Sequence, residues 1–326
     1  MGGFRTAMKI NTNRGSALLT VLWLTAALSA IGLAVAANVR GETDRTTTGL
    51  DDLRAYFIAR GAIDRALIHM QRGIAYYHRG DPRMELAFPG AIATVEIIPE
   101  TSKLSLGYTQ PEELLRLMAA LGIPQERGET ITAAILDWRT PPPQGSSSPF
   151  DAFYLSQTPS FVPMRTSSFL ETEELLLVRG VTPDIYYGTA LDGHGVNSGR
   201  AGLRDCVSAH ASGGGLDVNT ARRETLIAIG VDPGDAAAIV QRRSIRPILE
   251  QAEFEEIRKA VGPAGNRLGY GGNSMYTLRA TVQLLGTDGK PTDFRRTVAA
   301  LVKRFDPNNK QNRAPGFEVV RWYDRD

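Results

Sequence analysis

Few residues in this chain combine a type and a spacing that could do chemistry. Cys206 is the only cysteine, and His210, one of four histidines with His69, His78 and His194, follows it by four positions. Two such ligands do not make a zinc site, which needs four. The sequence also has no Gly-x-Ser-x-Gly, His-Glu-x-x-His or Walker-type motif. We therefore expect no catalytic centre and no zinc site.

Composition indicates an ordinary folded chain. The 326 residues are 42% hydrophobic and 22% charged, with a net charge of +2 spread along the sequence. This length allows two or three small domains with real cores. Because no basic tail or patch stands out, composition alone gives no reason to expect nucleic-acid binding.

A stretch without charge runs from Ser16 to Ala37. As a helix its 22 residues would span about 33 Å, enough to cross a hydrocarbon core of about 30 Å. Three basic residues and no acidic one precede it. The positive-inside rule therefore places the start of the chain in the cytoplasm and the part after Arg40 outside it.

Three interpretations of this segment are open. A secretory signal could be cut near Ala34–Ala36, although the apolar stretch is longer than the usual 7–15 residues. An uncleaved anchor is the second. We favour the third, because Arg14-Gly15 directly precedes the apolar run and resembles the leader of type IV pilins and pseudopilins. That resemblance implies cleavage after Gly15, with Ser16 as the N-methylated first residue of the mature chain.

Beyond the membrane, apolar residues continue at helical spacing, with charged residues between them. Strands are expected near both ends of the remaining chain. Residues 91–106 read as a hairpin around Pro99–Ser102, and residues 275–285 and 295–305 as a second one around Gly286–Pro291. A last strand is expected at 317–323.

The middle of the chain repeats itself. Each of four units begins with a short helix that has acidic residues near its start. A glycine and then an apolar residue or a proline follow, and a second helix comes after them. Their glycines are Gly122, Gly180, Gly230 and Gly262. These units predict a helical domain with helix–hairpin–helix or SAM-like repeats. Between the second and third units, residues 193–215 read as a loop, with a short strand at 203–207.

The expected organisation therefore has five parts: a leader at 1–15, a transmembrane helix at 16–39, an amphipathic helix and first hairpin at 40–106, an inserted helical domain at 107–265, and closing strands at 266–326. The fold class is α+β: a pilin-like module of one long helix and a small antiparallel sheet, interrupted by the helical insert.

The ordered motifs resemble the K-type minor pseudopilin of the bacterial type II secretion system, general secretion pathway protein K. They are Arg14-Gly15 with its apolar run, Leu136-Asp137-Trp138-Arg139, the segment ELLLVRGVTP at 174–183, and DVNTA at 217–221. The resemblance covers nearly the whole chain. It implies a structural protein of the inner membrane with its head in the periplasm, processed by prepilin peptidase and assembled with the I-type and J-type minor pseudopilins.

Thr20 occupies mature position five, where most pilin-like subunits carry a glutamate that neutralises a neighbour's N-terminal amine. An unpaired charge in an apolar fibre core is costly. The K-type family also typically lacks this glutamate, which implies a position at the tip of the fibre, with no subunit above it.

Some members of the family bind calcium in the helical domain. The candidates here are Asp137 and Asp151, a small set for an ion that takes six to eight oxygen ligands. We expect no other metal or cofactor.

Two other functions are alternatives. A membrane-anchored, competence-like protein could bind DNA through its helix–hairpin–helix units, but Asp232 and Asp235 place negative charge where phosphate would lie. The other is a minor pilin of a different type IV pilus-like system.

Overall fold

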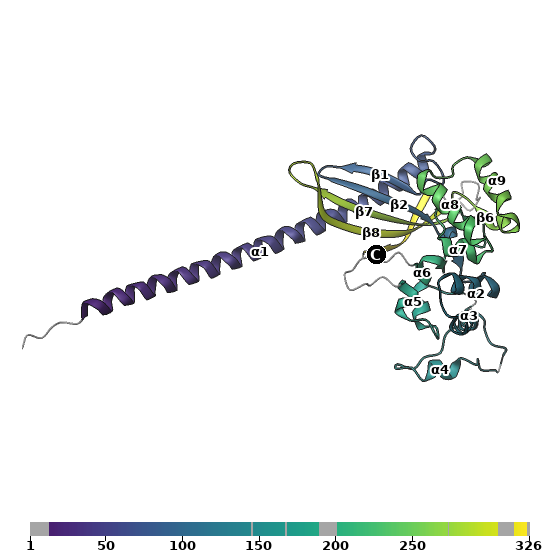
Figure 1. Ribbon diagram of the computed structural model, residues 1–326, viewed down its shortest axis with the longest axis horizontal. Coiled ribbons are helices and arrows are strands. Elements are labelled where there is room, and N and C mark those ends of the chain that lie inside the picture. The colour runs from purple at the N-terminus through teal and green to yellow at the C-terminus, as the bar shows by residue number, and fades with distance from the viewer. Residues whose placement is uncertain are drawn as a thin grey trace, which may run out of the picture. The chain divides into compact units, whose positions relative to one another are not determined.

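The computed structural model describes residues 13–144, 146–166, 168–188, 201–272, 274–305 and 316–324 (Figure 1). By its internal contacts the chain divides into two compact units, residues 1–55 and 56–326. Helix α1 (Asn13–Arg72) contributes to both. The predicted leader up to residue 12, and His194, lie outside the described residues.

The part of α1 that belongs to the second unit packs on a sheet. Its residues Ala59, Ala62, Ile63 and Ala66 are completely buried and recur at helical spacing. Arg65 donates a 3.2 Å hydrogen bond to a carbonyl in one edge strand, and the Arg60 guanidinium lies 4.3 Å from the ring centroid of Trp322 in the other. This part of the helix therefore crosses one face of the sheet.

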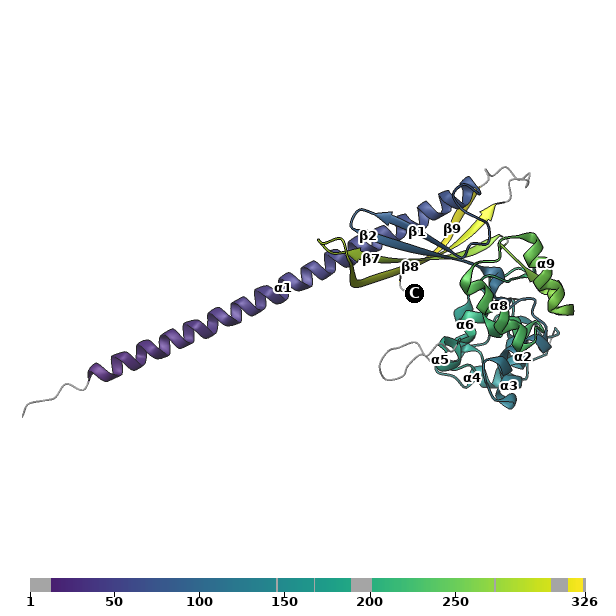
Figure 2. The same cartoon turned by 45° about the horizontal axis from the view of Figure 1, so that its top comes forward.

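The sheet has five antiparallel strands in the order β1-β2-β7-β8-β9 (Figure 2). Their bounds are β1 Arg83–Phe88, β2 Ala91–Pro99, β7 Met275–Leu285, β8 Pro291–Phe305 and β9 Gly316–Tyr323. Buried residues alternate strictly along β7 and at every second position of β2, as expected of strands with one face against a core. The predicted second hairpin and the last strand are confirmed.

Strand β2 pairs with β7 although about 175 residues separate them in sequence. In the sequence, the helical region lies between these two strands. Its elements are α2 Pro111–Ala120, α3 Gln125–Arg139, α4 Asp151–Leu155, α5 Pro183–Tyr187, α6 Leu203–Cys206, α7 Arg223–Ala228, α8 Pro233–Ile245 and α9 Gln251–Ala260, with 3₁₀ turns η2 Thr172–Leu177 and η3 Gly262–Arg267. They share one hydrophobic core.

All four glycines of the predicted repeats have positive φ, at 68° for Gly122, 87° for Gly180, 99° for Gly230 and 63° for Gly262. Such values cost glycine little and other residues more. The helix–hairpin–helix geometry is thus present at α2–α3 and α7–α8. In the second and fourth units one of the two helices is a 3₁₀ turn.

Two short parallel pairs join the helical region to its flanks. Strand β3 (Leu104–Ser105) pairs with β4 (Val207–Ser208), and β5 (Leu216–Asp217) pairs with β6 (Leu268–Gly269). In each pair one strand lies outside residues 107–265 and the other inside. The proposed limits of the inserted domain therefore cut through these pairs.

The predicted hairpin within residues 91–106 is wrong. Strand β2 instead forms a hairpin with β1, around Pro89-Gly90, where Gly90 has a φ of 72°. The expected turn at Pro99–Ser102 is a 3₁₀ turn, η1 (Glu100–Ser102). Its residues are buried, and Glu100 bonds to the distant residues Ser208 and Thr277. The strand expected at 203–207 is also wrong for most of its length, since Leu203–Cys206 is helix α6.

Candidate functional site

The described part of the chain contains one helix long and apolar enough to cross a membrane, the α1 segment within Leu18–Arg72. Apolar side chains from Leu18 to Val39 are exposed along it. The helix begins at Asn13, so Gly15 and Ser16 lie in its first turns, and Thr20 follows on an exposed position. This arrangement is consistent with membrane anchoring by the N-terminal segment.

The residues considered for metal binding are not assembled as a metal site. Cys206 is buried, and burial raises the pKa of its thiol to about 12, so it stays protonated. The His210 imidazole faces Glu171 instead, with 3.8 Å between Nε2 and Oε2. Over the described ranges, no group of three or more His, Cys, Asp or Glu side chains could hold a metal ion.

The structure does bring Asp137 and Asp151 together, from the end of α3 and the start of α4. What joins them is a third side chain, Arg165, whose guanidinium donates to both carboxylates, at 2.9 Å and 2.7 Å. The pair does not fit a calcium ion, because its oxygens already accept hydrogen bonds from the protein. Arg165 carries no recognisable sequence signal, and the sequence analysis missed it.

The motifs that carry the family resemblance contact one another. Trp138 Nε1 donates a 3.0 Å hydrogen bond to Glu174, the first residue of the segment ending in Val-Thr-Pro. Arg127 of α3 donates to the Gly180 carbonyl and to the Thr182 hydroxyl in the same segment. The two motifs therefore pack together as one unit.

The motif Asp217–Ala221 is a buried polar link between the helical region and the segments beside the sheet. The Asn219 amide donates to the carbonyls of Gly80 and Ile248 and accepts from the Ile248 N–H, at 2.8–3.1 Å. The Asp217 carboxylate accepts from the backbone at Asn219, Thr220 and Gly272. Burial raises the pKa of Asp217. One short motif thus holds segments that are far apart in sequence.

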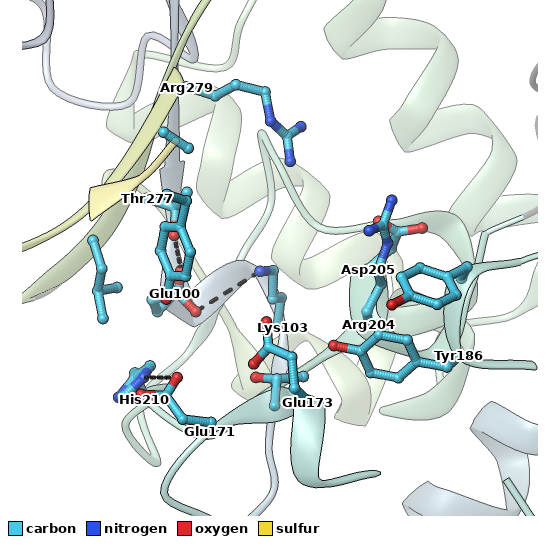
Figure 3. Close-up of a pocket in the computed structure, with 15 residues that line it drawn as sticks. Glu100, Lys103, Glu171, Glu173, Tyr186, Arg204, Asp205, His210, Thr277 and Arg279 are labelled. Atoms are coloured by element: carbon cyan, nitrogen blue, oxygen red, sulfur yellow. Dashed lines mark hydrogen bonds and ion pairs between the residues drawn. The ribbon is translucent and has the colours of Figure 1, made fainter. Parts of the chain in front are cut away.

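A polar cavity of about 290 Å³ lies between the sheet and the helical region (Figure 3). Glu100, the residue directly after β2, is buried beside it. The Glu100 carboxylate accepts hydrogen bonds of 2.5 Å from both Thr277 of β7 and Ser208 of β4. The Nζ atom of Lys103 lies 3.8 Å from Oε2 of Glu100.

Charges around this cavity neutralise one another. Burial acts to raise the pKa of Glu100, but Lys103 and the two hydroxyl donors outweigh it, and the pKa is lowered. On the other side, Glu171 of the helical region forms an ion pair with Arg321 of β9. These contacts therefore link the helical region to the sheet, and Figure 3 shows Lys103 directed at Glu100 and His210 at Glu171.

Comparison with known proteins gives both a family match and a structural match. Residues 105–189 match the family model described as "Type II secretion system (T2SS), protein K". The structure is similar to a chain in the crystal structure of the GspK-GspI-GspJ complex from the enterotoxigenic Escherichia coli Type 2 Secretion System. The TM-score is 0.55 at 13% identity, over 86% of this chain and 99% of that chain. No curated protein matches the sequence.

The two matches agree with the motifs found in the sequence. At this identity the structural match concerns the fold, and it confirms a pilin-like fold with a helical region. The family match falls on the segment that contains the Asp-Trp-Arg and Val-Thr-Pro motifs. Both matches support the predicted resemblance to type II secretion protein K, which the family model locates at residues 105–189.

Replacing Glu100 with Gln tests the hydrogen bonds of Glu100 with Thr277 and Ser208 and its ion pair with Lys103. At neutral pH we expect the free energy of unfolding to fall by about 1–3 kcal/mol, because Lys103 and the hydroxyl donors lose a charged acceptor. Since the folded pKa of Glu100 is lowered, its contribution is complete above the ordinary value of 4.5. It is lost as the pH falls through the folded pKa. The difference in unfolding free energy between the Gln variant and the unaltered protein should therefore shrink in acid. Urea unfolding between neutral and acidic pH measures this difference.

Glu96→Gln is the matched control. Glu96 lies four residues earlier, on β2, but it is more exposed and its partners Arg83 and Arg279 are 3.6–3.7 Å away. That change should cost less than about 0.5 kcal/mol. A Glu100→Gln deficit that stayed constant in acid would contradict the charge-based explanation.

Proposed function

We propose that this chain, which the comparisons support as a type II secretion system protein K, is a minor pseudopilin at the tip of the secretion pseudopilus. It would help to start and cap the fibre that exports proteins across the outer membrane. The observation that carries the proposal is the order of parts in one chain: an apolar N-terminal helix, an antiparallel sheet, and a helical region matching protein K inserted between paired strands. The chain is then a structural component and not an enzyme.

The anchor would lie in the inner membrane with the head in the periplasm, since basic residues precede the apolar segment. We infer that prepilin peptidase cuts between Gly15 and Ser16 and that Ser16 is then N-methylated. The uncharged Thr20 supports a terminal position, because a subunit with none above it needs no buried carboxylate for a neighbour's amine. The bulk of the helical region supports the same position.

Partner subunits would pack along α1. Leu50, Leu53, Phe57 and Ile68 lie on one stripe of this helix, at spacings of three, four and eleven residues, and each is 49–63% exposed. An exposed apolar stripe on a helix suits packing against the helices of other subunits. The similar structure is a complex of GspK with GspI and GspJ. We infer that the I-type and J-type minor pseudopilins are the partners here.

DNA binding is not favoured by the geometry of the third repeat. Asp232 caps α8 by accepting a 2.8 Å hydrogen bond from the Gly234 N–H, a donor that a phosphate would otherwise use. Asp235 adds a second negative charge in the same turn. A DNA backbone would meet repulsion at this hairpin.

Processing gives the first test of the anchor. The mature chain extracted from membranes should begin at Ser16, measured by intact mass. Gly15→Val should block cleavage, because the larger side chain crowds the peptidase site, and the mass should then correspond to the whole leader. A mature chain starting near Ala37, or an uncut chain in cells with active prepilin peptidase, would contradict the proposal.

Assembly gives the second test. A soluble chain starting at Glu42 should form a ternary complex with the soluble heads of the I-type and J-type partners at micromolar concentration, measured by size-exclusion chromatography with mass determination. The double change Leu53→Ser and Phe57→Ser should weaken association at least about tenfold, because two apolar side chains lose their burial.

Ile245→Ser is the matched control for that experiment. Ile245 is also an exposed apolar helix residue, 83% accessible, but it lies at the end of α8 and away from the stripe. This change should leave the complex intact. If the unaltered head shows no association, or instead retains DNA at physiological salt, the proposed function fails.

A further inference from the structure

Three segments of the helical region meet at one ionic cluster. Asp137 lies in the last turn of α3, Asp151 begins α4, and Arg165 lies in the irregular segment after α4. The Arg165 side chain is only 4% exposed, and the two carboxylates are 14% and 19% exposed. The segment between Asp137 and Arg165 contains Pro141, Pro142 and Pro143 and little regular structure. This cluster therefore connects the two ends of that segment to each other and to the start of α4.

Each carboxylate oxygen of the pair has a donor from the protein. Arg165 donates through Nε and Nη2 to Asp137 Oδ2, at 3.2 Å and 2.9 Å, and through Nη2 to Asp151 Oδ1, at 2.7 Å. Ser148 donates its hydroxyl to Asp137 Oδ1 and its N–H to Asp151 Oδ2, the latter at 2.9 Å. The hydrogen bond from Arg165 also lowers the pKa of Asp151, so this carboxylate is charged at neutral pH.

The backbone conformation at Arg165 is unusual for a residue other than glycine. Its φ is 47°, the only positive value among the described residues other than glycine. That left-handed region favours glycine. An arginine in this conformation is explained by its guanidinium, which reaches both carboxylates at once.

Two carboxylates from separate helices that converge on one position supply part of the oxygen ligands that a divalent cation takes. Here the central group belongs to the protein. Arginine suits this role, because its planar donors bond two carboxylates in fixed directions and it is always charged.

We propose that Arg165 is a built-in substitute for a divalent cation, so that the segment from Asp137 to Arg165 folds without calcium. Removing Arg165 would leave two facing carboxylates and turn the cluster into a site that responds to calcium. The inference does not depend on the proposed function, because it concerns only the folding of the purified chain.

The test uses the full chain in detergent, with thermal unfolding followed by tryptophan fluorescence. Trp138 adjoins Asp137 and lies 5.6 Å from the Tyr154 ring in α4, so its emission reports on this region. The unaltered protein should have the same Tm, within about 1 °C, in millimolar calcium chloride and in millimolar EGTA. Chymotrypsin cleavage between residues 140 and 168 should be equally slow in both.

Arg165→Met should lower the Tm in EGTA by about 5–10 °C, because it leaves two partly buried carboxylates without a counter-charge. Calcium should restore a substantial part of this loss and slow the cleavage of residues 140–168. With Asp137→Asn and Asp151→Asn added to Arg165→Met, calcium should have no effect, which assigns the response to these two carboxylates.

Arg165→Lys and Arg165→Gly separate charge from backbone conformation. Lysine keeps the charge and should retain part of the stability, whereas glycine relaxes the backbone but loses the charge and should behave like methionine. The proposal is overturned if calcium raises the Tm of the unaltered protein by several degrees. It is also overturned if Arg165→Gly is as stable as the unaltered protein, or if Arg165→Met does not respond to calcium.

Discussion

The pairing of β2 with β7 is the constraint on which the rest of the head depends. Ala91–Pro99 pairs residue by residue with Tyr276–Leu284, so both ends of the helical region must meet at the same end of the sheet. Backbone groups at this meeting point are removed from water and need partners. Glu100, Asp217 and Asn219 bond to groups there that lie up to 177 positions away in the sequence. These links explain how a large region of helices can be inserted without disrupting the strands around it.

The tip subunit proposed here would have two tasks, and this arrangement would separate them. The buried face of α1, with Ala59, Ala62 and Ile63, is used by the sheet of its own chain. The exposed stripe through Leu53 and Phe57 would then remain for the proposed partner subunits. The helical region adds bulk at one end of the sheet and keeps its own core, so its size would affect where the subunit can stand in the fibre without weakening its attachment.

Sequence reasoning succeeded where the signal is local. The glycines of the four repeats and the turn at Gly286–Lys290 are recognisable from sequence, because few other residues adopt the required backbone conformation. It failed where distant segments decide the outcome. Pro99–Ser102 has the composition of a turn, yet Glu100 is buried by partners more than 100 positions away. Arg165 was missed for the same reason, since nothing near it in sequence indicates that two carboxylates converge on it. The resemblance to protein K could be found from sequence because its motifs are short runs of neighbouring residues that are readable without knowing the fold.

Locating the chain in assembled pseudopili tests the central claim most directly. Isolated fibres can be labelled with gold-conjugated antibody against the helical region and imaged by electron microscopy, with an antibody against the major subunit as a positive control. A subunit that starts and caps the fibre should be labelled at one end only, and the number of labels should not increase with fibre length. Labels distributed along the fibre, in proportion to its length, would contradict the account.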